Sequence, residues 1–144
     1  MWTSRKPFEQ DLHDAYDKPA KDVVARFIAE SSGLRVIPNP DQYGVDLLLY
    51  RGDNHVGGVE VEVRQWSPNC PYPTIHIPHR KQKFFGKRVL FFALTKDMRK
   101  AYWITTDGID KYPLKEVRNV KVASGEHFYD VPTKDFAFVD LIGE

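Results

Sequence analysis

The segment from Gly58 to Arg64 alternates strictly between apolar and charged residues, and this alternation limits the folds open to the chain. Successive side chains of a β-strand point to opposite faces of the sheet, so its three valines would share one face. The other face would carry three charged side chains, those of Glu60, Glu62 and Arg64. The pattern predicts a strand in a sheet that packs one face on a core and leaves the other face polar.

Apolar spacing and turn residues predict the remaining elements. An amphipathic helix is expected from about 18 to 32, with Pro19 in its first turn and Gly33 just past its end. A basic helix is expected from Pro78 to about Phe85. Short β-rich runs predict strands at 34–37, 45–50, 56–66, 74–77, 89–94, 101–105 and 136–141, with turns at 51–55, 107–108 and 124–125.

The length of 144 residues suits one domain, because it is too short for two ordinary hydrophobic cores. We divide this single domain, 1–144, into an N-terminal arm (1–17), a core (18–105) and a β-rich C-terminal extension (106–144). The order of helices and strands predicts an α/β fold in which helices pack against a mixed sheet.

The hairpin formed by segments 45–50 and 56–66 brings acidic residues together. If Arg51 faces His55 across the turn, Asp46 lies opposite Glu60. A shift of two residues, through a bulge at 57–58, places Asp46 opposite Glu62 instead. Either register gathers three carboxylates on one face of the hairpin.

Like charges on neighbouring strands destabilise a sheet by an amount of the order of 0.2–1 kcal/mol per pair, unless something balances them. Hard divalent cations such as Mg²⁺ or Mn²⁺ take oxygen ligands, and one bound between the carboxylates would balance their negative charges. Asp46 favours this interpretation, because it interrupts an otherwise apolar strand. The alternative is an ordinary solvated strand face on which Arg64 pairs with Glu62.

The motifs Gly-Val-Asp-Leu-Leu at 44–48 and Val-Glu-Val-Glu-Val-Arg at 59–64, within the order helix, three strands, helix and strand, resemble the PD-(D/E)XK nuclease superfamily. The likeness is to archaeal-type Holliday junction resolvases and small phage nucleases, and it covers roughly 18–103. It implies a restriction-endonuclease-like core, in which the helix, a three-stranded meander, the second helix and a strand follow one another.

The resemblance also implies an activity, that of an Mg²⁺-dependent (or Mn²⁺-dependent) endonuclease or exonuclease that hydrolyses the phosphodiester bonds of DNA, with selectivity for DNA structure. Asp46 matches the motif aspartate, and Glu60 or Glu62 matches the motif acid, so these three residues would bind the metal. Arg64 would hold the scissile phosphate.

One position departs from the motif, because its lysine is replaced by Glu62 or by Arg64, depending on which glutamate is the motif acid. An arginine can hold a phosphate but cannot readily act as a base, since its pKa stays above about 12. The alternative function is therefore a catalytically inactive domain of the same fold that binds nucleic acid or a partner protein. Many members also use an acid on the first helix, where Asp22 is the nearest candidate, but its helical position predicts that it faces solvent.

The segment from His79 to Arg88 is rich in basic residues and contains no acid, although the net charge of the chain is only +1. Arg80, Lys81 and Lys83 are expected to contact DNA phosphates. The alternative is an exposed helix that its lysines make soluble.

No apolar run reaches the roughly 18–20 residues of a membrane helix, and no secretory signal precedes the domain, so we expect a cytoplasmic protein, in the host cytoplasm if it is phage-encoded. A homodimer is a further expectation, drawn from the resemblance. Cys70, His76 and His79 do not predict a zinc site, because a fourth ligand and a paired cysteine are missing.

Overall fold

The computed structural model describes residues 5–119 and 122–142, with side chains at 16–116 and 127–142. One long helix is followed by nine strands and three short 3-10 helices in this part of the chain. Their order is α1 (Arg5–Ser32), β1 (Arg35–Pro38), β2 (Leu47–Arg51), β3 (Asn54–Val63), β4 (Thr74–Pro78), η2 (His79–Phe84), β5 (Val89–Leu94), β6 (Lys100–Thr105), η3 (Ile109–Lys111), β7 (Leu114–Asn119), β8 (Val122–Pro132), η4 (Thr133–Asp135) and β9 (Ala137–Asp140).

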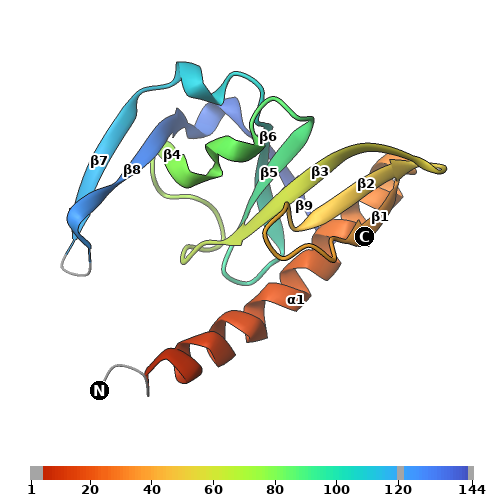
Figure 1. Cartoon of the computed structure of the whole chain (residues 1–144), viewed down its shortest axis with the longest axis horizontal. Helices are drawn as coiled ribbons and strands as arrows, with labels where there is room; N and C mark the ends of the chain where they lie inside the picture. The colour runs from red at the N-terminus through yellow and green to blue at the C-terminus, as the bar shows by residue number, and fades with distance from the viewer. Residues whose placement is uncertain (1–4, 120–121, 143–144) are drawn as a thin grey trace.

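Two sheets form the body of the molecule (Figure 1). The larger sheet has the strand order β1-β2-β3-β5-β6-β9, and it is mixed because β3 and β5 run parallel while its other neighbours are antiparallel. The smaller sheet, β4-β8-β7, is antiparallel throughout. The predicted α/β class with a mixed sheet is confirmed.

Helix α1 covers one face of the larger sheet, and its first turns extend beyond the sheet edge (Figure 1). The buried residues Ala20, Val24 and Ile28 repeat every four positions, so they form a stripe that packs against Val59 of β3 and Phe92 of β5. Burial of this apolar stripe, more than intrinsic propensity, holds a helix of this kind in place.

The predicted start of this helix at residue 18 and the predicted irregular arm at 1–17 are wrong for residues 5–17, since α1 begins at Arg5. Pro19 lies inside the helix rather than in its first turn. A proline removes one backbone hydrogen bond, yet α1 continues through this position, and the packed stripe begins at the next residue, Ala20. Gly33 ends the helix as predicted, with a φ of 75° and an N–H that donates to the Ala29 carbonyl at 2.9 Å.

The smaller sheet covers the opposite face of the larger sheet. Ile75 and Ile77 of β4 pack there with Phe91 of β5 and Tyr129 of β8. Alternate residues of β5 thus point into two different cores, which explains why 89–94 is a continuous apolar run and why its bounds could be predicted from the sequence.

Near Asp46, the β2–β3 hairpin has the predicted register in which Asp46 lies opposite Glu60. Leu47 pairs with Val59, so the residue before Leu47 lies beside the residue after Val59. The turn itself differs from the prediction, because Arg51 pairs with Asn54 rather than with His55. The bulge lies at Val56, which is unpaired, and not at 57–58. It shifts the pairing by one residue, so that from Leu49 and Gly57 onward the strands have the register that places Asp46 beside Glu60.

The second half of the chain holds two further differences. The predicted basic helix at 78–85 is the short 3-10 helix η2, which Pro78 precedes and the left-handed Gly86 follows. The turn predicted at 124–125 falls inside β8, so 106–144 contains a long β7–β8 hairpin. The turn predicted at 107–108 and the strands predicted at 101–105 and 136–141 match the structure closely. Among the described helices, none is long and apolar enough to cross a membrane.

Candidate active site

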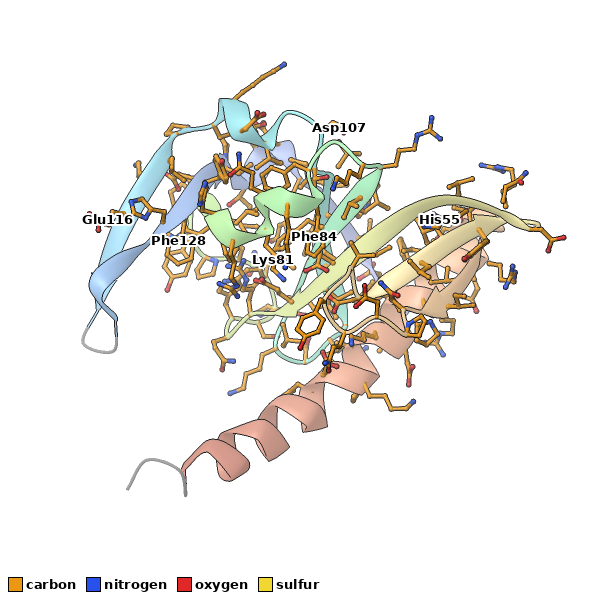
Figure 2. The ribbon with its side chains drawn as sticks, viewed as in Figure 1. His55, Lys81, Phe84, Asp107, Glu116 and Phe128 are labelled. Atoms are coloured by element: carbon orange, nitrogen blue, oxygen red, sulfur yellow. The ribbon has the colours of Figure 1, made fainter. Side chains whose placement is uncertain are left out.

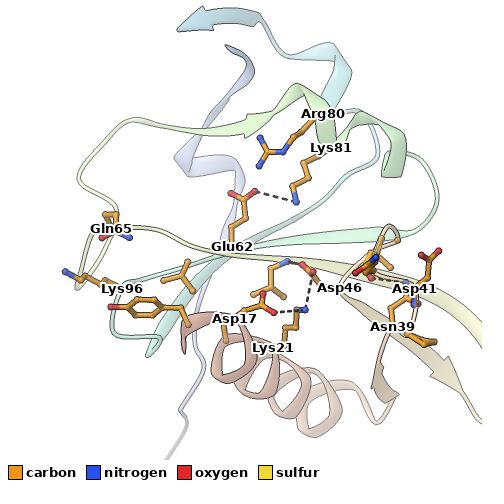
Figure 3. Close-up of a pocket in the computed structure, with 18 residues that line it drawn as sticks. Asp17, Lys21, Asn39, Asp41, Asp46, Glu62, Gln65, Arg80, Lys81 and Lys96 are labelled. Atoms are coloured by element: carbon orange, nitrogen blue, oxygen red, sulfur yellow. Dashed lines mark hydrogen bonds and ion pairs between the residues drawn. The ribbon is translucent and has the colours of Figure 1, made fainter. Parts of the chain in front are cut away.

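A groove of about 890 Å³ lies where α1, the loop before β2, the end of β3 and η2 meet (Figure 3). Four acidic and four basic side chains line it: Asp17, Asp41, Asp46 and Glu62, with Lys21, Arg80, Lys81 and Lys96. The groove is therefore close to charge balance. A phosphate that enters it adds negative charge, and an additional cation would offset that charge.

Asp46 is held beside β3 by two hydrogen bonds. The backbone N–H of Val61 donates to Asp46 Oδ2 at 2.8 Å, and the N–H of Asp46 donates to Glu60 Oε2 at 3.1 Å. The loop before β2 is also fixed, since Asn39 Nδ2 donates to the Val45 carbonyl at 2.9 Å. These contacts place the Asp46 carboxylate at the groove wall.

Glu60 lies behind this wall, with a residue exposure of only 3%. Burial raises the pKa of the Glu60 carboxyl, and the charge of Asp46 raises it further. The ammonium group of Lys81 acts in the opposite direction by donating a hydrogen bond to Glu60 Oε1. Glu60 thus depends on Lys81 for its charged form.

Lys81 also reaches the second glutamate of β3. Its Nζ lies 3.7 Å from Glu62 Oε2, and its side chain is 18% exposed (Figure 3). Glu62 lines the groove, whereas Glu60 does not. Of the three acids predicted to converge, two therefore face the groove and one supports them from beneath.

Arg64 points away from the groove, toward the smaller sheet. Its Nη2 donates to Glu62 Oε1 at 3.0 Å and to the backbone carbonyl of His76 at 2.6 Å, and its guanidinium lies over the ring of Phe91 at 6.0 Å. This arrangement ties β3 to β4. It matches the pairing of Arg64 with Glu62 that the alternative interpretation of the sequence expected.

Two groove residues on α1 escaped the sequence analysis. Lys21 Nζ lies 2.9 Å from Asp17 Oδ2 and 3.7 Å from Asp46 Oδ1. Burial lowers the pKa of Lys21, but the hydrogen bond that Lys21 donates to Asp17 and the charge of Asp46 outweigh burial and leave that pKa raised. Asp22, the acid considered for this helix, is exposed and pairs with Lys18. The i, i+4 spacing of Asp17 and Lys21 was the signal available in the sequence.

The three basic residues predicted to contact DNA do not share one location. Arg80 and Lys81 line the groove. Lys83 is exposed on η2 outside the groove, with its Nζ over the ring of Phe84 at 5.1 Å.

No group of three or more His, Cys, Asp or Glu side chains is arranged to hold a metal ion in the described part of the chain. Mg²⁺ does not require such a group, because it commonly keeps several waters and binds through one or two carboxylates together with substrate phosphates. Asp46 and Glu62 supply carboxylates of this kind at the groove wall. Carboxylates that line the groove without forming a three-carboxylate cage would suit a cation that arrives with its substrate.

The residues considered for zinc lie in separate contacts. Cys70 is buried, with Sγ 3.5 Å from the Tyr72 carbonyl, while His76 pairs with Asp130 at 3.3 Å and His79 packs on Tyr129. Comparison of the chain with protein families, with curated proteins and with solved structures found no match.

Proposed function

We propose that the protein is a metal-dependent deoxyribonuclease that hydrolyses phosphodiester bonds of DNA. The observation that carries the proposal is the arrangement of Asp46 and Glu62, two carboxylates from adjoining elements that line one groove together with four basic side chains. Oxygen ligands suit Mg²⁺ or Mn²⁺, and the basic side chains suit phosphates.

The order of elements supports the same proposal. Helix α1, the antiparallel strands β1, β2 and β3, and then β5 parallel to β3 follow the order that the resemblance to PD-(D/E)XK nucleases implies for a restriction-endonuclease-like core. In this proposal the second helix of that core is reduced to η2. Asp46 and the acids of β3 take the positions of the motif acids.

The residues of the groove would divide the work between binding and chemistry. Asp46 and Glu62 would hold the metal ion, which when bound activates water and offsets charge on the phosphate. Arg80, Lys21 and Lys96 would bind backbone phosphates without selecting sequence. In the reaction, a water oxygen forms a bond to phosphorus, the bond from phosphorus to one sugar oxygen breaks, and that oxygen leaves with a proton.

Nicking of supercoiled plasmid in Mg²⁺ or Mn²⁺ tests the proposal. The wild type is expected to cut, and Asp46→Asn and Glu62→Gln are expected to lose cutting while keeping the fold measured by circular dichroism. Asp53→Asn, an exposed acid in the β2–β3 turn, is the matched control and should cut normally. A wild type that is inactive in both metals, or activity that survives both groove substitutions, would refute the proposal.

A second candidate function is a domain that binds nucleic acid without cutting it. The observation in its favour is that Lys21 and Lys81 already balance the acids of the site. A gel-shift experiment on the same DNA distinguishes the two functions. Binding by the wild type together with no cutting in either metal would favour the inactive domain.

A further inference from the structure

Strand β3 lacks a cation aimed at the groove, although a nuclease site of the proposed kind needs one beside its acids. Glu62, at one of the two positions where the motif has a lysine, is negatively charged. The Arg64 side chain is 21% exposed and is bound to Glu62 and to the His76 carbonyl. To contact a phosphate in the groove, Arg64 would have to break its hydrogen bond with the partly buried carbonyl of His76 and its ion pair with Glu62.

Lys81 is the cation that lies where β3 provides none. Its ammonium group donates to Glu60 and lies 3.7 Å from Glu62 Oε2, so it touches both acids of β3. It lines the same groove as Asp46. Lys81 lies about twenty residues after these acids in the sequence. The crossover from β3 through β4 and η2 to the parallel strand β5 brings it back beside them.

The 3-10 geometry of η2 is what turns Lys81 inward. A 3-10 helix has three residues per turn, so side chains three positions apart lie above one another. Lys81 and Phe84 are the two partly buried residues of η2, while His79, Arg80, Gln82 and Lys83 are exposed. Figure 2 marks Lys81 and Phe84 on this helix. Both partly buried residues thus lie on one side of η2, and this side carries Lys81 to the acids.

We infer that Lys81, supplied by η2, takes the catalytic position that a lysine on β3 would occupy, and that Arg64 is a structural tie between β3 and β4. This inference rests on the proposed nuclease function. The Lys81 ammonium would contact a non-bridging oxygen of the scissile phosphate and stabilise the negative charge that builds up as the water attacks. Its contacts with Glu60 and Glu62 hold it ready for that contact without a change in the backbone.

Single-turnover cleavage of a DNA substrate, with the enzyme in excess, tests this role. Lys81→Met keeps most of the length of the side chain and removes its charge, and it should slow cleavage by about 100-fold to 1,000-fold, as loss of a preorganised donor does. Lys134→Met is the matched control, because Lys134 is an exposed lysine on another 3-10 helix, η4, and it should leave the rate unchanged.

Two measurements separate a catalytic role from a structural one. DNA affinity in Ca²⁺ and Mn²⁺ affinity by electron paramagnetic resonance should stay within a few-fold in Lys81→Met, because Asp46 and Glu62 remain. Lys81→Cys followed by alkylation with bromoethylamine restores an ammonium group at nearly the same length and should restore most of the rate. The parallel treatment of the wild type controls for reaction at Cys70.

Arg64→Met should behave in the opposite way. It should lower the melting temperature, with a smaller loss of single-turnover rate than Lys81→Met causes. If the wild type cuts DNA and Lys81→Met cuts equally fast, the role assigned to Lys81 is wrong while the nuclease function stands. If Arg64→Met loses the rate and keeps the melting temperature, Arg64 is the catalytic cation. If the wild type does not cut at all, both proposals fall together.

Discussion

The backbone N–H of Asp46 donates to the side chain of Glu60, and it thereby fixes a buried carboxylate behind a groove carboxylate. The two negative charges lie close to one another, and water barely reaches that of Glu60, which is buried. This is why burial and Asp46 raise the pKa of Glu60. The wall of the groove therefore contains unfavourable electrostatic energy that Lys81 only partly relieves.

Glu60→Gln should make the protein more stable at neutral pH. A raised pKa in the folded state means that the charged form of Glu60 destabilises the fold, so the wild type gains stability as pH falls through that pKa toward and below the ordinary value of 4.5. The introduced glutamine side chain mimics the neutral form at every pH, and its carbonyl can still accept from Lys81. The advantage of the variant should shrink as the solution becomes acidic.

Urea unfolding of the wild type and of Glu60→Gln across this pH range measures the effect, and the difference between the two free energies of unfolding cancels contributions from other groups. A difference that stays constant with pH, or that widens in acid, would contradict the interpretation.

Lys21 and Lys18 form a matched pair on α1, since each faces an aspartate four residues away. The Lys21 side chain is 28% exposed and also reaches Asp46, whereas the Lys18 side chain is 81% exposed. Lys21→Met should weaken DNA binding in low salt and reduce the salt dependence of that binding. Lys18→Met should leave binding and melting temperature unchanged, and equal effects of the two substitutions would remove Lys21 from the site.

The close approach of β3 to its neighbours predicts a specific suppression. A Cβ at position 58 would lie 2.7 Å from Val45 Cγ2, so Gly58→Ala should destabilise the protein by about 1–3 kcal/mol. Adding Val45→Ala removes the atom that clashes and should recover part of this loss in a double-mutant cycle.

Gly57→Ala is the control for this suppression, because the added Cβ would lie 2.5 Å from the backbone oxygen of Arg88 and not near Val45. Val45→Ala should therefore not recover the stability that Gly57→Ala loses. Free energies of unfolding from urea titrations measure both cycles, and equal suppression at the two glycines would show that local packing does not explain the effect.

Two tyrosines compare a buried hydrogen bond with one at the surface. The buried Tyr102 hydroxyl accepts from the Cys70 N–H at 3.0 Å, and Tyr102→Phe leaves that donor unpaired at a cost of about 1–3 kcal/mol. The Tyr112 hydroxyl donates to Asp135 at 2.8 Å at the surface, and Tyr112→Phe should change stability by no more than about 0.5 kcal/mol. Thermal unfolding of both variants measures the difference, and a smaller loss for Tyr102 than for Tyr112 would contradict it.

Local patterns predicted the centre of the fold well. The alternation at 58–64 and the apolar run at 89–94 depend only on which faces of β3 and β5 are buried, and that information lies within each strand. The Asp46–Glu60 register followed from counting across the hairpin. Its turn was wrong by one residue, and the bulge at Val56 offset the error.

Features set by tertiary contacts could not be predicted in the same way. Pro19 suggests a helix start, but α1 begins at Arg5 and runs through this proline, so Asp17 lies on a helix and not in the predicted irregular arm. In β8, Ser124 and Gly125 suggest a turn, but pairing with β7 continues past them. Basic residues at 79–88 predicted a helix that faces DNA, but the contacts of Lys81 with Glu60 and Glu62 depend on how the short 3-10 helix η2 packs beside β3, which no local pattern gives.

The parallel pairing of β3 with β5 also bears on when the groove forms during synthesis. A growing chain that has reached η2 already contains Asp46, Glu60, Glu62 and Lys81, but it lacks the strand that closes the crossover. Only after Leu94 leaves the ribosome can β5 insert beside β3 and hold η2 over the acids. On this order of folding, Lys81 meets the carboxylates late, and a chain truncated before β5 would contain all four side chains without bringing them together.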